Sequence, residues 1–151
     1  MTHPVCSVVV PSYRSAQTIH ACLTALVSQD FSLPYEIIVV DSSPDDTPQL
    51  VQRDFPQVQL VHLTKQTDPA LARNIGAQRA QSEILAFIDA DCVAAPDWLS
   101  RLYETLQHGY DAAGGAIVNA DRESLVAWAR LRAITTRYWL SAAYHPPLIC
   151  T

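Results

Sequence analysis

The sequence predicts an α/β protein with a Rossmann-like architecture, in which helices flank a mainly parallel sheet. Three observations predict this class. Apolar runs that suit buried strands alternate along the chain with segments of helical periodicity. Two of these runs, at residues 36–41 and 84–89, end in a carboxylate, as expected where the carboxyl ends of parallel strands form a binding edge. The length of 151 residues suits one domain, so residues 1–151 are treated as a single unit.

The composition narrows the classes of function. A hydrophobic content of 49% with 17% charged residues is typical of a globular protein. The net charge of -5 argues against a nucleic-acid-binding protein, because a phosphate backbone attracts a basic surface. No apolar run approaches the roughly 18 to 20 residues of a membrane span. There is no signal-peptide pattern and the four cysteines show no metal-ligand spacing, so we expect a cytoplasmic protein with reduced thiols.

The first half of the chain predicts three strands and two helices. Strands are expected at residues 5–10, 36–41 and 58–63, and the alternation of the third places it nearer the edge of the sheet. Ser15 is the expected N-cap of a helix that continues to about residue 29 with apolar side chains at helical spacing. Thr47 and Pro48 open a short helix that ends before Pro56, because proline suits the first helical turn.

The second half continues the alternation. A helix is expected from residue 69 to about 80, where the small residues Ala72, Gly76 and Ala80 allow close packing on the sheet. The unbroken apolar run at 84–88 predicts a central strand buried on both faces. A helix at about 96–107 and a weaker strand at 111–118 follow.

Residues 123–143 predict a long amphipathic helix. One arc of this helix is apolar and consists of Trp128, Leu131, Ile134, Tyr138 and Trp139. We expect the arc to pack against further protein, with self-association as one way to cover it and a membrane surface as the alternative.

An acidic pair, Asp89 and Asp91, follows the strand expected at 84–89. Two carboxylates one residue apart repel each other, and a hard divalent cation such as Mg²⁺ or Mn²⁺ is a common reason to place them together. Without a ligand, this pair would be a solvated strand end or a helix cap. Two other polar residues that could belong to a binding site also have a non-functional interpretation: Asp41 as a turn former and Arg73 as a helix-surface arginine.

Four segments in this order resemble the family-2 glycosyltransferases with the GT-A fold. They are Ser7-Val8-Val9-Val10-Pro11-Ser12-Tyr13, Ile37-Ile38-Val39-Val40-Asp41-Ser42-Ser43-Pro44-Asp45-Asp46-Thr47, Ala72-Arg73-Asn74-Ile75-Gly76 and Phe87-Ile88-Asp89-Ala90-Asp91. Each segment alone is a weak signal, whereas the ordered set is a strong one. The resemblance covers residues 5–118 and implies the nucleotide-sugar-binding, N-terminal portion of such an enzyme.

The resemblance implies an inverting transfer of a sugar from a nucleotide-diphosphate sugar, with a UDP-sugar favoured, to a saccharide or lipid-linked acceptor. The Asp89-Ala90-Asp91 motif, at the end of the fourth segment, would make the reaction metal-dependent. Asp91 would ligate Mg²⁺ or Mn²⁺ at the donor diphosphate, and Asp89 would approach the ribose or a metal-bound water. The implied substrate-binding residues are Pro11, Ser12, Tyr13, Asp41, Arg73 and Asp89. The implied location is cytoplasmic, extending to the periphery of the inner membrane face.

The sequence departs from the family pattern in two places. Residues 65–69, before Arg73, lack the glycine often found there in the family. No segment matches the acceptor-binding half or its catalytic base, so we expect a chain truncated at its C-terminus, with Asp121 the first base to test. Nucleotide-sugar binding without turnover is therefore an alternative function.

A phosphatase of the haloacid dehalogenase type is a second, remote alternative. Residues 89–93 fit its Asp-x-Asp-x-Val signature, with Asp89 as nucleophile and Asp91 as general acid. That family needs a later lysine, and no lysine follows Asp91.

Overall fold

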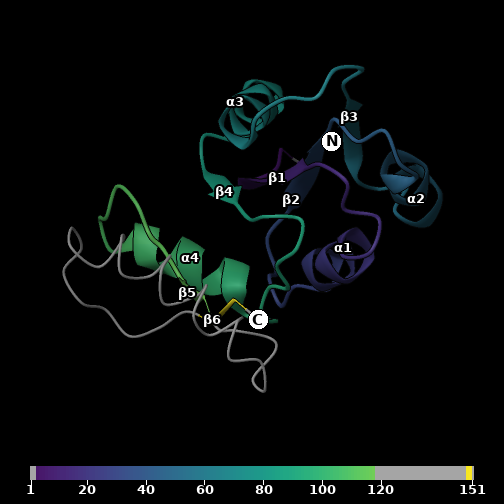
Figure 1. Ribbon diagram of the computed structural model, residues 1–151. Helices are drawn as coiled ribbons and strands as arrows, with labels where there is room; N and C mark the ends of the chain where they lie inside the picture. Colours follow the sequence, from purple (N-terminus) through teal and green to yellow (C-terminus); the bar gives the residue numbers. More distant parts are fainter. Residues whose placement is uncertain (1–2, 118–148, 151) are drawn as a thin grey trace.

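The centre of the fold is a parallel sheet of four strands in the order β3-β2-β1-β4. A computed structural model of the chain describes residues 3–117 and 149–150. The strands are β1 (Cys6–Ser12), β2 (Tyr35–Asp41), β3 (Gln59–His62) and β4 (Leu85–Phe87). All three pairings between them are parallel. Every strand therefore presents its carboxyl end at the same edge of the sheet (Figure 1).

Helices cover both faces of this sheet. The helices α1 (Ile19–Val27) and α2 (Thr47–Asp54) lie on one face and α3 (Pro69–Arg79) lies on the other (Figure 1). The start of α4 (Trp98–Gln107) joins the same core cluster as α1 and α2. This arrangement confirms the predicted α/β class with helices flanking a parallel sheet.

The two central strands are buried because their apolar residues alternate between two cores. In β1 and β2, Val8, Val10 and Val39 belong to the core shared with α1 and α2. Ile38 and Val40 belong to a smaller core with Ala72 of α3. A strand covered on both faces has no polar face, which is why these strands read as unbroken apolar runs.

Gly76 sets the distance between α3 and the sheet. A Cβ atom added at this position would overlap Val9 Cγ1 and would lie 3.3 Å from Val40 Cγ2. The structure thus confirms the close packing predicted from the small residues of this helix. The N-cap of α3 is Asp68, whose carboxylate accepts a hydrogen bond from the backbone N–H of Leu71 at 2.9 Å.

The predicted strand at 84–89 is wrong in its extent and in its burial on both faces. The strand β4 spans only Leu85–Phe87 and lies at one end of the described four-stranded sheet, while β1 and β2 are central. Phe87 remains 44% exposed. Beyond the strand the chain turns back on itself, with the Cys92 N–H donating to the Asp89 carbonyl at 3.0 Å. The apolar run therefore includes a residue that no described element covers.

Two further boundaries differ from the prediction. The helix α1 begins at Ile19 with Thr18 as its N-cap, and residues 15–18 form a preceding turn in which the Ser15 carbonyl accepts from the Thr18 N–H at 3.0 Å. Ser15 is therefore not the N-cap. Within the predicted strand at 111–118, the described part is extended only at β5 (Ala116–Ile117), which pairs in parallel with β6 (Ile149–Cys150).

The predicted helix at 123–143, its apolar arc and Asp121 lie outside the described residues. Among the helices that are described, none combines the length and the apolar character needed to cross a membrane.

Candidate functional site

An acidic turn follows β4 and carries the predicted pair of carboxylates. Ile88 and Ala90 are each 5% exposed, so their side chains point into the core. Asp89 and Asp91 alternate with them and are exposed. The alternation of the strand thus continues into the turn, and both carboxylates face outward.

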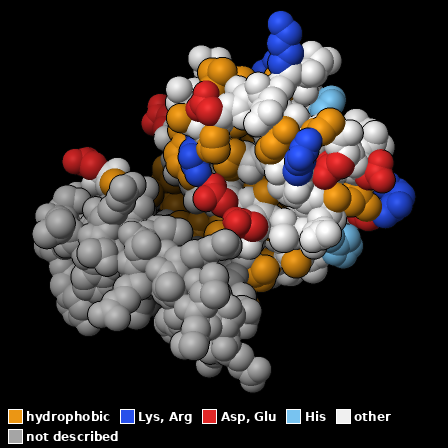
Figure 2. All heavy atoms as spheres, in the orientation of Figure 1, with side chains coloured by type: hydrophobic (Ala, Val, Ile, Leu, Met, Phe, Trp, Pro, Cys, Tyr) orange, Lys and Arg blue, Asp and Glu red, His pale blue; other side chains and the backbone are white. Residues whose placement is uncertain are grey.

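The helix α3 supplies a cation to this turn. Arg73 Nη2 lies 2.5 Å from Asp89 Oδ1, and the two side chains are 36% and 54% exposed. Arg73 lies one helical turn before Gly76, so the close approach of α3 to β1 carries the guanidinium to the end of β4. Basic and acidic side chains also lie near one another on the face drawn in Figure 2, beside a hollow with hydrophobic walls.

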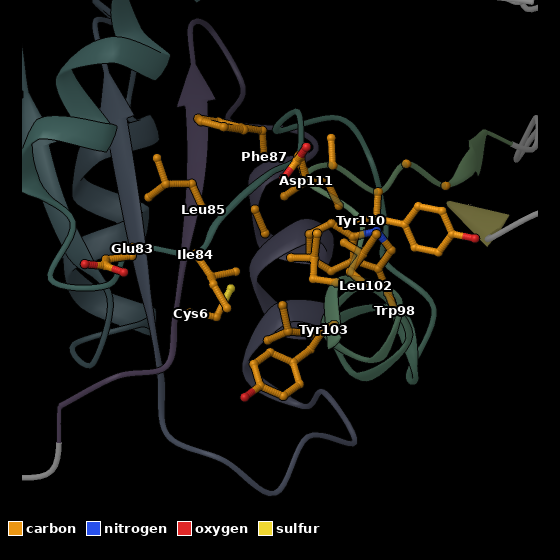
Figure 3. A pocket seen from close by; sticks show the side chains of 18 of the residues that line it. Cys6, Glu83, Ile84, Leu85, Phe87, Trp98, Leu102, Tyr103, Tyr110 and Asp111 are labelled. Carbon is orange, nitrogen blue, oxygen red and sulfur yellow. The ribbon is translucent and has the colours of Figure 1, made fainter. Parts of the chain in front are cut away.

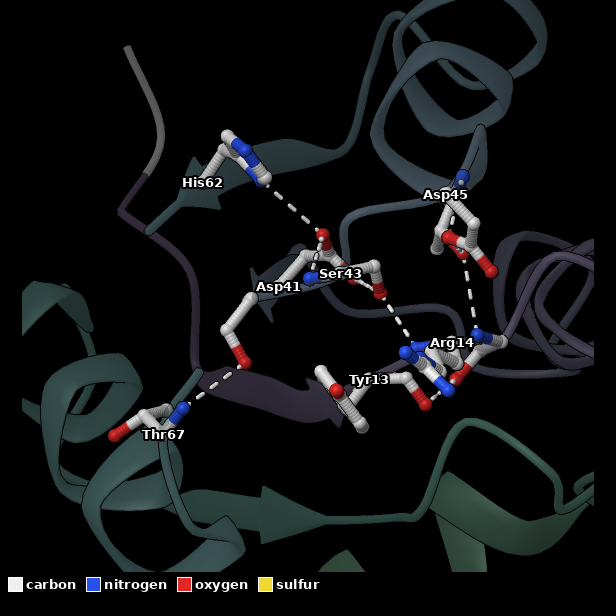
Figure 4. A network of polar contacts seen from close by, with 10 residues as sticks. Tyr13, Arg14, Asp41, Ser43, Asp45, His62 and Thr67 are labelled. Carbon is white, nitrogen blue, oxygen red and sulfur yellow. Dashed lines mark hydrogen bonds and ion pairs between the residues drawn. The ribbon is translucent and has the colours of Figure 1, made fainter. Parts of the chain in front are cut away.

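A buried polar network occupies the end of β2 (Figure 4). The Asp41 side chain is fully buried, with 0% exposure. Its Oδ1 accepts from the Ser43 N–H at 2.9 Å, and its Oδ2 accepts from the Ser43 hydroxyl at 2.6 Å. His62 Nδ1 lies 3.1 Å from Oδ1. Ser43 Oγ in turn accepts from the Arg14 N–H at 2.6 Å, which joins the loop after β1 to the loop after β2.

The loop after β1 is held in an uncommon conformation. Arg14 has a φ of 53°, in the left-handed region that non-glycine residues rarely adopt. The hydrogen bond to Ser43 fixes its backbone, and its guanidinium lies 5.5 Å from the centroid of the Tyr13 ring. Such strain persists where surrounding contacts determine the backbone, and it is concentrated at functional sites.

A second link between the two loops passes through Thr47. The Thr47 hydroxyl accepts from the Ser15 N–H at 3.1 Å and donates to Asp45 Oδ1 at 2.5 Å. Burial acts to raise the pKa of Asp45, but hydrogen bonds from Thr47 and from backbone groups together hold that pKa below its ordinary value. The start of α2 is therefore tied to the loop after β1.

A pocket of about 460 Å³ opens beside this network. The Tyr13 hydroxyl donates to Gln66 Oε1 at 3.1 Å and so connects two of its walls. Ser12 lies next to it in sequence, and its buried Oγ has no hydrogen-bond partner among the described residues. The pocket is lined by Tyr13, Ser42, Ser43, Pro44, His62, Leu63, Thr64 and Gln66.

A larger groove of about 750 Å³ runs between β4, α4 and the segment after α4 (Figure 3). Its walls are mainly apolar and include Leu85, Phe87, Trp98 and Leu102. Arg73 and Asp89 also line it, so the acidic turn forms part of this groove as well. Tyr110 lies on the side of the groove away from Leu85 of β4 (Figure 3).

The structure brings the predicted residues together in two groups. Tyr13 lines the 460 Å³ pocket, and Asp41 lies beneath it in the network. Arg73 and Asp89 meet at the acidic turn, next to Asp91. Pro11 is buried within β1 opposite Val40 and does not line the pocket.

The sequence prediction missed His62 as a site residue. His62 pairs in register with Asp41 of the neighbouring strand, so both residues end their strands at the same edge. Asp41 was predicted as a site residue because it ends a parallel strand at the binding edge, and the same reasoning applies to His62. Ser43 and Gln66 were also missed, because they lie in loops whose shape no periodicity predicts.

The acidic turn has the chemistry that a hard divalent cation needs. It offers carboxylate oxygens, the ligands that Mg²⁺ and Mn²⁺ prefer. The Asp91 side chain lies at the surface beside Cys92, and Asp89 uses Oδ1 for Arg73. Within residues 3–117 and 149–150, no group of three or more His, Cys, Asp or Glu side chains is placed to hold a metal. The turn thus suits an ion that takes further ligands from a phosphate group and water, as Mg²⁺ commonly does.

Comparison with known proteins identifies the family. The model for glycosyl transferase family 2 matches residues 7–148. The chain belongs to glycosyltransferase family 2. Glycosyltransferase AglE of Haloferax volcanii is 34% identical over 122 residues, which are 77% of this chain and 40% of AglE. Succinoglycan biosynthesis protein ExoO of Rhizobium meliloti is 36% identical over 126 residues, which are 81% of this chain and 35% of ExoO. Aligned with these relatives, the chain spans 40% or less of their length.

Solved structures with the same fold confirm the GT-A class. Residues 1–349 of S. aureus TarS in complex with UDP-GlcNAc give a TM-score of 0.67 at 28% identity, covering 79% of this chain and 36% of that one. The mannosyltransferase PcManGT from Pyrobaculum calidifontis in complex with GDP-Man and Mn²⁺ gives a TM-score of 0.61 at 32% identity. This match covers 80% of this chain and 36% of PcManGT. The resemblance inferred from four short segments is therefore correct, and family membership displaces the phosphatase alternative.

Proposed function

We propose that this chain is the donor-binding part of a glycosyltransferase that uses a nucleotide-diphosphate sugar, with UDP as the favoured nucleotide. The observation that carries the proposal is the common position of the pocket and the acidic turn. Both follow the carboxyl ends of strands in one parallel sheet, where ligands of α/β proteins bind. TarS, a structural relative, is known in complex with UDP and with UDP-GlcNAc.

The two groups of residues divide the donor between them. The 460 Å³ pocket takes the base and ribose, with the Tyr13 ring as an apolar surface and Ser42 and Ser43 as polar ones. The diphosphate extends to the acidic turn, where Arg73 offers a planar, permanently charged donor to phosphate oxygens. Binding of the diphosphate then competes with Asp89 for the same guanidinium.

Asp91, assisted by Asp89, would hold Mg²⁺ or Mn²⁺ at the donor diphosphate. When bound there, the cation neutralises the charge that develops on the departing nucleoside diphosphate. PcManGT, whose solved complex contains GDP-Man and Mn²⁺, supports this use of a divalent ion. Arg73 contributes charge of the same sign from α3.

The reaction we infer is a direct displacement that inverts the anomeric carbon. The acceptor, a saccharide or a lipid-linked molecule, must lose a hydroxyl proton to a base as the sugar is transferred. We assign that base to none of the described residues. The cytoplasmic location expected from the sequence is part of this proposal.

A thermal-shift panel tests the donor assignment. The purified chain is heated with UDP, CDP, GDP, ADP or a UDP-sugar, in Mn²⁺ or in excess EDTA. A ligand at 100 times its dissociation constant stabilises the folded state by about 2.7 kcal/mol, so binding is readily detected. We expect UDP and UDP-sugars to stabilise the chain most, and EDTA to reduce the effect.

A pair of variants controls for non-specific charge effects. Asp91→Asn should remove the response to Mn²⁺, whereas Asp30→Asn, which changes an exposed carboxylate outside both the pocket and the groove, should retain it. Stabilisation by no nucleotide would contradict the function. Equal stabilisation in Mn²⁺ and EDTA would contradict its metal dependence alone.

A further inference from the structure

The buried state of Asp41 limits what this carboxylate can contact. Its side chain has 0% exposure, and Ser43 N, Ser43 Oγ and His62 Nδ1 surround its two oxygens. A ligand in the adjacent pocket therefore reaches Asp41 only if one of these partners moves away. In the structure, the surface offered to a ligand consists of the partners themselves.

The hydrogen-bond pattern fixes the proton of the His62 ring. Ser43 Oγ accepts from the Arg14 N–H, so its own proton is directed to Asp41 Oδ2. Oδ1 already accepts from the Ser43 N–H. Both carboxylate oxygens are thus acceptors, and His62 Nδ1 must be the donor across the 3.1 Å contact. In the neutral ring, the lone pair then belongs to Nε2.

His62 is the member of this pair that a ligand can touch. Its side chain is 39% exposed, and it forms part of the pocket wall. Nε2 has no hydrogen-bond partner among the described residues. Gln66, on another wall, uses Oε1 to accept from Tyr13, which leaves its amide N–H groups as donors. The pocket therefore offers an acceptor on one wall and donors on another.

We propose that His62 Nε2 is the base-contacting acceptor of this pocket and selects uracil, while Asp41 is a positioning residue that holds the His62 tautomer. This inference rests on the proposed function, because it concerns the nucleotide bound there. Uracil carries a donor, N3–H, between two carbonyl acceptors, and it can give that hydrogen to Nε2. Cytosine has a bare acceptor at N3, which would face the Nε2 lone pair without a hydrogen between them.

A modified nucleotide separates His62 from Asp41 as the group that receives N3–H. UDP and UDP methylated at N3 are titrated calorimetrically into the wild-type chain and into His62→Ala. In the wild type, methylation should weaken binding by at least about tenfold, the loss expected when one hydrogen bond is removed and a methyl group is inserted. In His62→Ala, UDP should bind about tenfold more weakly, and methylation should change its affinity by less than about threefold.

His62→Asn is the matched control for folding. Its amide can donate to Asp41 in place of Nδ1 but is too short to present a group where Nε2 lies. It should keep the wild-type melting temperature and still lose discrimination against N3-methyl UDP. A methylation penalty of wild-type size in both variants would overturn the assignment of His62 and return the contact to Asp41. Failure of UDP to bind the wild type would instead overturn the proposed function, and this inference with it.

Discussion

Arg73 in α3 and Asp89 in the turn after β4 form an ion pair across sixteen residues of sequence. The contact joins the helix on one face of the sheet to the acidic turn at its edge. Because both side chains are partly exposed, the pair contributes little to the free energy of unfolding. Its importance is that it holds a positive and a negative charge together at the edge of the sheet.

Replacing Arg73 by alanine should weaken diphosphate binding selectively. We expect UDP to bind roughly tenfold more weakly, since a charge-assisted hydrogen bond is lost, while uridine affinity is unchanged. The free energy of unfolding should fall by no more than about 1 kcal/mol. Calorimetric titrations with both ligands measure the difference. Arg79→Ala, which removes an exposed arginine from the same helix, is the control and should change neither affinity.

Adding one methyl group to Gly76 should destabilise the fold. In Gly76→Ala the new Cβ would overlap Val9 Cγ1, so α3 must move away from the sheet, at a cost of about 1 to 3 kcal/mol. Urea denaturation measures this cost. Helix propensity alone favours alanine over glycine by about 1 kcal/mol, so a stabilised variant would mean that the contact with β1 is not tight. Gln78→Ala, at an exposed position of α3, should have little effect.

Removing the Asp41 carboxylate should cost stability as well as ligand affinity. Asp41→Ala leaves the Ser43 N–H, the Ser43 hydroxyl and His62 without their acceptor, and an orphaned buried donor costs about 1 to 3 kcal/mol. The loss should appear in urea denaturation without any nucleotide. Glu104→Ala, at an exposed position of α4, is the matched control. If Asp41→Ala unfolds at the wild-type midpoint, the network does not stabilise the loop.

Alkaline pH should destabilise the chain through Cys6. Burial raises the pKa of this thiol from its ordinary 9.0 to about 11, so the folded state holds the proton more tightly than the unfolded chain. The resulting stability is fully present below pH 9.0 and is lost as the pH rises toward about 11. We expect the stability difference between the wild type and Cys6→Ala to shrink over this window. A difference that stays constant would show that the thiol does not titrate as inferred.

The central strands and α3 were predictable because their sequences carry local signals. β1 and β2 are buried on both faces, so nearly every residue is apolar, and the small residues of α3 reflect the contact of Gly76 with Val9. The extent of β4 was overestimated for a related reason. Its apolar run is unbroken, but Phe87 is exposed, and an apolar run does not reveal whether a covering element is present.

The contacts that assemble the site depend on tertiary structure. The position of Arg73 in the helical pattern does not distinguish it from any arginine on a helix surface. It contacts Asp89 because α3 packs closely on the sheet. The hydrogen bond between Asp41 and His62 depends on the register of β2 with β3, which the sequence does not specify. Ser43 contacts Asp41 from a loop and also accepts a hydrogen bond from the Arg14 N–H, which belongs to the loop after β1.

One nucleotide that spans both the pocket and the acidic turn must affect residues at both places. This is tested by a titration of UDP into the ¹⁵N-labelled chain, followed by amide chemical shifts with Mg²⁺ and by paramagnetic broadening with Mn²⁺. We predict that UDP shifts the amides of the pocket residues Tyr13, Ser43 and His62, and that in its presence Mn²⁺ broadens signals around Asp89 and Asp91. Shifts confined to the groove beside α4, or broadening centred away from the acidic turn, would show that the nucleotide does not span the two.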